Sequence, residues 1–206
     1  MSIASGVLNN SAARRVMSGI IEPPAKGLLK IGVSPDAITV VGCVGASAAA
    51  LWFLPRGQFA LALIVIGVFA ISDLLDGTMA RMRGTSGPWG NFLDATLDRV
   101  TDGAVFAGLA LYGMRADLPW VVGGALFAVV TGQVVSYAKA RAEAVGATAN
   151  VGIAERAERL IITGVGVLLA AFGLSLALPA ALWIVGVLGF ITIVQRMLHV
   201  RGQLRA

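Results

Sequence analysis

The chain has one cysteine, one histidine and few charged residues, and each shortage excludes a class of protein. A lone cysteine, Cys43, cannot build a disulfide framework, so we expect it to pack within a helix. His199 lies at the end of the last apolar run, where we expect an interfacial side chain rather than a metal ligand. Only 13% of the 206 residues are charged while 57% are apolar, which excludes an ordinary soluble domain. The composition therefore predicts an integral membrane protein.

Apolar stretches of about the length that crosses a bilayer recur along the chain. We predict an all-α integral membrane protein with six transmembrane helices, at about 36–54, 58–83, 89–114, 119–142, 155–174 and 179–200. The first ten residues lack the continuous apolar core of a signal peptide.

The segment before the first predicted span has its own pattern. Apolar residues from Ala13 to Ile21 recur at helical spacing, while Arg14 and Arg15 fall on another face. This pattern predicts an amphipathic helix that lies on the membrane surface, and we expect Pro23 and Pro24 to end it. The predicted organisation is a cytosolic juxtamembrane segment at 1–33 and a six-helix domain at 34–206.

The basic residues indicate how the helices are oriented. Of the sixteen Lys and Arg, only Arg56 and Arg115 fall in the loops on one side of the predicted topology. The positive-inside rule then places both termini, and the carboxylates described next, on the cytosolic side of a multi-pass cell-membrane protein. Because the basic residues border apolar spans instead of forming a soluble patch, the net charge of +5 does not indicate nucleic-acid binding.

Four aspartates interrupt the apolar pattern in the middle of the chain. Asp73 and Asp76 are three residues apart, and Asp94 and Asp98 are four apart, so each pair lies on one face of a helix. An uncompensated Asp in a bilayer costs at least ~2.5 kcal/mol. The four carboxylates therefore predict a cage for a divalent cation, for which Mg²⁺ is the natural ion because it prefers oxygen ligands.

Small and basic residues follow the first aspartate pair. Gly77 and Ala80 leave a shelf with little side chain beside the predicted metal, and Arg81 is one turn beyond Gly77. A guanidinium binds phosphate bidentately. The combination of acids, shelf and arginine predicts a site for a metal-bound nucleotide diphosphate. The alternative for the four acids is a buried ion-pair network with Arg81, Arg83 and Arg99.

The spacing of these residues resembles a family signature. The pattern Asp73-x2-Asp76-Gly77-x2-Ala80-Arg81-x8-Gly90-x3-Asp94-x3-Asp98 is similar, position by position, to that of the CDP-alcohol phosphatidyltransferases. The resemblance implies six transmembrane helices, a homodimer, and two Mg²⁺ or Mn²⁺ ions held by the four aspartates. It also implies that Asp98 serves as general base. The nucleotide-binding residues that it implies are Asp36, Ala37, Ile38, Thr39, Gly77, Ala80 and Arg81.

The reaction that the resemblance implies consumes CDP-diacylglycerol. An acceptor hydroxyl attacks the β-phosphorus, CMP leaves, and a phosphatidyl group passes to the acceptor. A carboxylate near the hydroxyl removes its proton. One substrate is a membrane lipid and the other is water-soluble, so we expect the site at the cytosolic ends of the helices.

A second set of polar residues bears on the acceptor. It comprises Ser136, Lys139, Arg156, Arg159 and Arg196. Serine or free inositol would need mostly hydroxyl and amide partners, whereas so much positive charge favours a phosphorylated acceptor. The stretches Ser136–Glu143 and Gly152–Leu160 also resemble those of the actinobacterial phosphatidylinositol phosphate synthases within that family. This second resemblance implies inositol 1-phosphate as the acceptor and the five residues as its phosphate site.

Three alternatives stay open at this point. Glycerol 3-phosphate would also need a basic pocket, which would give a phosphatidylglycerophosphate synthase. Basic residues at cytosolic helix ends are also expected from topology alone. A six-span magnesium transporter would present membrane carboxylates too, but a pore needs acids spread along its depth, and here they are gathered beside a glycine shelf.

Overall fold

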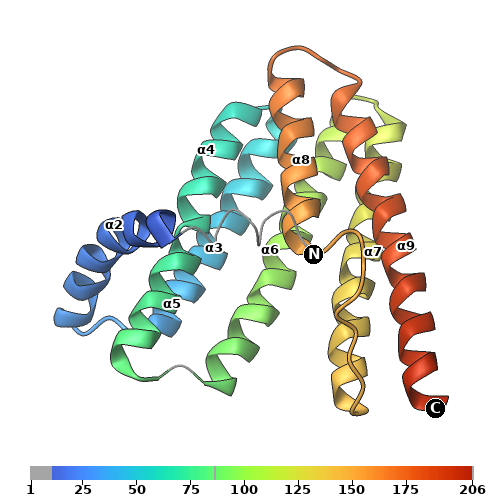
Figure 1. Ribbon diagram of the computed structural model, residues 1–206. Helices are drawn as coiled ribbons and strands as arrows, with labels where there is room; N and C mark the ends of the chain where they lie inside the picture. Colours follow the sequence, from blue (N-terminus) through green and yellow to red (C-terminus); the bar gives the residue numbers. More distant parts are fainter. Residues whose placement is uncertain (1–10, 86, 206) are drawn as a thin grey trace. The chain divides into compact units, whose positions relative to one another are not determined.

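The computed structural model describes residues 11–85 and 87–205, with side chains from residue 21 onward. Within these ranges every regular element is helical, which confirms the all-α prediction (Figure 1). The α-helices are α2 (Ser11–Lys30), α3 (Pro35–Phe53), α4 (Phe59–Ala70), α5 (Ser72–Arg83), α6 (Pro88–Arg115), α7 (Pro119–Ala144), α8 (Arg156–Ala171) and α9 (Ala177–Arg205). A short 3-10 turn, η1 (Leu54–Arg56), follows α3.

Four segments of the described chain are long and apolar enough to cross a membrane. They are Pro35–Arg56, Phe59–Arg83, Pro119–Ala144 and Ala177–Arg205. Each overlaps one of the six predicted spans, and together they confirm an integral membrane protein. The other two predicted spans coincide with α6, which has acidic residues along its first half, and with α8, which has only 16 residues.

The chain divides into two compact units. Unit 1 contains Ile64–Thr101 and the described residues up to Ala48, and unit 2 contains Ala49–Leu63 and the described residues from Asp102 onward. Helices α3, α4 and α6 contribute residues to both units, whereas α2 and α5 belong to unit 1 and α7, α8 and α9 to unit 2.

Helix α2 corrects one expectation about the N-terminal segment. Pro23 and Pro24 do not end the helix, which continues to Lys30 and bends along its length (Figure 1). A proline removes its own backbone N–H, and its ring crowds the carbonyl four residues earlier, but its fixed φ is one that a helix uses. A kinked helix can therefore continue where packing compensates. Helix α2 contacts α5, and Ala25, directly after the prolines, is fully buried.

Close helix contacts in unit 1 depend on glycines of α3. A Cβ at Gly42 would collide with the Ser72 hydroxyl, and one at Gly45 would collide with the Phe69 ring. Ser72 donates a hydrogen bond to the carbonyl of Phe69 where α4 gives way to α5. The absent side chains let α3 approach this junction closely, which places the first turn of α5. Cys43 is buried on the same helix, as expected from its sequence context.

Unit 2 is built on the contact of α9 with α7 and α8 (Figure 1). A Cβ at Gly124 would lie 2.9 Å from the Cβ of Leu182, and one at Gly189 would lie 2.7 Å from Oγ1 of Thr131. Small residues thus bring the α7 and α9 backbones together, as they do in many membrane helix pairs.

Candidate functional site

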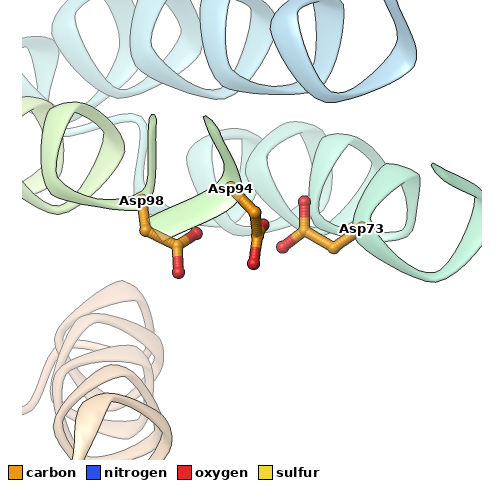
Figure 2. A group of neighbouring side chains, drawn as sticks. All are labelled: Asp73, Asp94 and Asp98. Carbon is orange, nitrogen blue, oxygen red and sulfur yellow. The ribbon is translucent and has the colours of Figure 1, made fainter. Parts of the chain in front are cut away.

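Three of the four predicted metal ligands converge in unit 1. Asp73 lies in the first turn of α5, and Asp94 and Asp98 lie one turn apart on α6. One carboxylate oxygen of each lies within 4.8 Å of those of the other two. Figure 2 shows Asp73 pointing from α5 toward the two side chains of α6. Residues of two helices, 21 and 25 positions apart in sequence, therefore form one acidic cluster.

The chemistry of this cluster fits a hard divalent cation. All three residues offer carboxylate oxygens, which are the ligands that Mg²⁺ and similar ions prefer. Three like charges this close repel one another unless a cation or protons neutralise them. Asp73 and Asp94 are exposed and Asp98 is half-buried, so an ion and a ligand can reach them.

Asp76 is placed differently from the other three acids. It is buried and accepts a hydrogen bond of 2.6 Å from the Thr39 hydroxyl of α3. Asp73 and Asp94 are close enough to act on it electrostatically. The structure therefore brings Asp76 beside the three-carboxylate cluster but fixes one of its oxygens on α3.

The three bases of the ion-pair alternative for the acids are placed differently from one another. Arg99 Nη2 lies 3.8 Å from Asp98 Oδ2, and both side chains are partly buried. Arg81 and Arg83 are both exposed. Arg81 donates from Nη2 to the Thr78 hydroxyl on its own helix at 2.9 Å. Of the three bases in this alternative, Arg99 is therefore the one that lies beside an acid of the cluster.

The residues predicted to bind the nucleotide lie on α3 and α5 of unit 1. Arg81 folds over the glycine shelf, since a Cβ at Gly77 would lie 3.5 Å from its Nη1. Ala80 and Ile38 are half-buried and Ala37 is exposed, with the Ala37 N–H capped by the Ser34 hydroxyl at 3.2 Å. The shelf and most of the first turn of α3 are thus partly accessible, and Arg81 lies over the shelf.

Trp89 is a neighbour of this region that the sequence analysis missed. Its indole Nε1 donates to Asp36 Oδ2 at 2.8 Å, which links the start of α6 to the start of α3. A signal existed, because Trp89 directly precedes the signature Gly90. The 53 residues between the partners made the pairing itself unpredictable from local pattern.

The five residues predicted for the acceptor lie in unit 2, and contacts with the α7 backbone bring Ser136, Arg159 and Arg196 together. Arg196 donates to the carbonyls of Val135 at 2.6 Å and Val151 at 2.9 Å. The Ser136 hydroxyl donates to Gly132, and a Cβ at Gly132 would lie 3.3 Å from Nε of Arg159. The α7 backbone around Gly132 to Ser136 therefore adjoins Arg159 of α8 and Arg196 of α9.

Asp102 completes this group, although the sequence analysis did not select it. Its side chain is 7% exposed, and its carboxylate oxygens lie 3.3 Å from Nε of Arg156 and 3.8 Å from Nη2 of Arg159. Lys139, half-buried, is one turn along α7 from the Val135 carbonyl. The four-residue spacing of Asp94, Asp98 and Asp102 was a usable signal, since it continues one helical face.

Comparison with known proteins gives consistent matches. Residues 32–197 match the family model described as CDP-alcohol phosphatidyltransferase. A phosphatidylinositol phosphate synthase of Streptomyces avermitilis is 46% identical over 202 residues, covering 94% of this chain and 83% of that protein. The Mycobacterium tuberculosis protein of the same name is 44% identical over 191 residues, covering 90% and 87%.

Solved structures resemble the chain to a similar degree. The crystal structure of the M. tuberculosis phosphatidylinositol phosphate synthase with CDP-DAG bound has a TM-score of 0.82 and 42% identity, covering 88% of this chain and 93% of that one. The structure of that synthase with manganese and citrate also has a TM-score of 0.82 and 42% identity, covering 87% and 88%.

Proposed function

Because the chain belongs to the CDP-alcohol phosphatidyltransferase family, we propose that it transfers the phosphatidyl group of CDP-diacylglycerol to inositol 1-phosphate. The products are CMP and phosphatidylinositol phosphate. The observation that carries the proposal is the convergence of Asp73, Asp94 and Asp98 at the spacing of the family signature. Relatives named phosphatidylinositol phosphate synthase, similar over most of the chain, support the choice of acceptor.

Asp73, Asp76, Asp94 and Asp98 hold the divalent ions in this proposal. The donor set suits two Mg²⁺ or Mn²⁺ ions, and the relative crystallised with manganese supports such use. Bound divalent ions would supply positive charge for the diphosphate and for the departing CMP. Thr39 keeps one oxygen of Asp76 fixed through its hydrogen bond.

Asp98 is the proposed general base. The acceptor hydroxyl gives its proton to an Asp98 oxygen as its own oxygen forms a bond to the β-phosphorus. The bond between that phosphorus and the CMP oxygen breaks, and CMP leaves with the electron pair. Arg81, the Gly77 and Ala80 shelf, and the turn from Asp36 to Thr39 hold the nucleotide.

In this proposal the phosphate of the acceptor binds to the basic residues of unit 2. Arg156, Arg159, Arg196 and Lys139 provide charge-assisted donors, and Ser136 provides a hydroxyl. A phosphate group supplies the negative charge that neutral acceptors lack. This is why we prefer inositol 1-phosphate to free inositol.

An acceptor assay tests the proposal. Purified protein in detergent is given CDP-diacylglycerol, Mg²⁺ and one acceptor at a time, and released CMP is measured. We expect turnover with inositol 1-phosphate and little with free inositol or serine. Faster turnover of glycerol 3-phosphate would make the acceptor assignment wrong and leave the family assignment standing.

We also propose a membrane arrangement: six transmembrane helices in a homodimer in the cell membrane, with α2 on the cytosolic surface and a domain boundary near residue 33. The four apolar segments support part of this arrangement. Exposed aromatic residues support the outer boundary. The guanidinium carbon of Arg56 lies 3.7 Å from the ring centroid of Trp52, and Trp120 lies in the first turn of α7, which follows the Arg115 loop. Tryptophans favour membrane interfaces.

Cysteine labelling tests the orientation. In a protein with Cys43 replaced by Ala, single cysteines near residues 56 or 115 should react with an impermeant thiol reagent added to intact cells. Cysteines near residues 84 or 148 should react only after the membrane is opened. Labels at 84 and 148 that react from outside would reverse the proposed orientation.

A further inference from the structure

Asp102 is the buried acid for which the proposed reaction gives no role. It lies on α6 with 5% of its surface exposed, and its carboxylate is placed between two guanidinium groups of α8. Buried carboxylates in membrane proteins are rare and usually functional. An account based on stability alone is weak, because apolar residues can replace a buried ion pair without loss of stability.

The contacts of Asp102 show how it acts on its neighbours. Oδ1 accepts from Nε of Arg156 at 3.3 Å, and Oδ2 lies 3.8 Å from Nη2 of Arg159. Each oxygen therefore faces a different arginine, and one carboxylate bridges two cations. The contact to Arg156 is made at the inner nitrogen of the guanidinium, so it restricts rotation of the group.

The second arginine is fixed from other directions as well. Arg159 is 2% exposed and donates from Nη1 to the Ala154 carbonyl at 3.4 Å. Arg156, which is 30% exposed, is the more accessible of the two. Two guanidinium groups held close together repel each other. One carboxylate between them reduces this repulsion.

We infer that Asp102 is a positioning residue for the acceptor-phosphate site: it holds Arg156 and Arg159 in the geometry in which they bind the phosphate of the acceptor. This inference rests on the proposed function of these arginines. Asp102 itself does not touch the substrate. Its removal should weaken acceptor binding and leave CDP-diacylglycerol binding as it is.

The test measures both KM values in Asp102→Ala and Asp102→Asn. Asp102→Ala should raise the acceptor KM roughly ten-fold, because a misplaced guanidinium loses a charge-assisted hydrogen bond. Asp102→Asn keeps an oxygen that accepts from Arg156 and should give a smaller rise. The KM for CDP-diacylglycerol should stay unchanged. Calorimetric titration of inositol 1-phosphate into the purified protein should show the same order of affinities.

A double-mutant cycle distinguishes the positioning of Arg156 by Asp102 from a general loss of structure around the site. If Asp102 acts through Arg156, the effect of Asp102→Ala on the acceptor KM should shrink when Arg156 is already Ala. Asp117→Asn is the matched control, because Asp117 is an exposed acid of the same unit that undergoes the same chemical change. That variant should behave as wild type.

Several outcomes would overturn the inference. They are equal rises in both KM values, multiplicative effects in the double variant, or an unchanged acceptor KM in folded Asp102→Asn. If Asp102→Ala does not fold, Asp102→Asn and the calorimetric titration decide the matter. If wild type uses glycerol 3-phosphate in place of inositol 1-phosphate, the proposed acceptor is wrong, and the same cycle with glycerol 3-phosphate decides the role of Asp102.

Discussion

Asp98→Asn should reduce CMP release by about 100- to 10,000-fold, because the amide cannot accept the proton of the acceptor hydroxyl. The substitution also removes one negative ligand from the cluster with Asp73 and Asp94, which should weaken the binding of the divalent ion. The measurement is CMP release by purified protein with CDP-diacylglycerol and inositol 1-phosphate. A melting curve and size-exclusion profile like those of wild type show that the variant is folded.

Two further variants make this result specific. Glu22→Gln is the matched control, because Glu22 lies in the same unit and forms only an exposed pair with Lys26. Arg99→Ala addresses the ion-pair alternative. If Asp98 served only as the partner of Arg99, Arg99→Ala would reduce turnover as much as Asp98→Asn. We expect Arg99→Ala to retain most of the activity.

Arg156→Ala should raise the KM for inositol 1-phosphate by roughly ten- to a hundred-fold, since a charge-assisted hydrogen bond is worth ~1.5–3 kcal/mol. The KM for CDP-diacylglycerol should change little. Arg156 is the best test of the basic set because Arg159 and Arg196 are almost fully buried. Removing either of those would also disturb backbone contacts and folding.

Arg81→Ala provides the opposite pattern. It should raise the KM for CDP-diacylglycerol and leave that for inositol 1-phosphate nearly unchanged, because Arg81 lies over the Gly77 shelf on α5. The two variants together test whether nucleotide and acceptor have separate basic sites. Equal rises of both KM values in Arg156→Ala would contradict the assignment of the acceptor site.

Some conclusions followed from local pattern alone. The membrane environment follows from the apolar composition, and the helical class follows from apolar runs of about 20 residues, the length with which a helix crosses a bilayer. The pairing of Asp94 with Asp98 follows from a spacing of four residues, because a helix turns once in about 3.6 residues. Family membership was also visible in the sequence, since the signature is a short pattern of fixed spacing.

Local propensity misled where packing compensated for it. Pro23 and Pro24 are strong helix breakers in isolation, but α2 continues through them to Lys30. Its contact with α5 and the burial of Ala25 are properties of the folded chain, which no window of sequence contains.

The sequence by itself therefore determined the membrane environment, the helical class and which acids could bind a metal. These properties depend on composition, on the length of apolar runs or on residues within one helical turn of each other. Only the tertiary structure decided three pairings: the hydrogen bond from Thr39 to Asp76, the hydrogen bond from Trp89 to Asp36, and the bridge that Asp102 makes between Arg156 and Arg159. These partners are 37 to 57 residues apart in sequence. Their pairing depends on how the helices pack, and packing is a collective result of the small residues and buried surfaces of several helices.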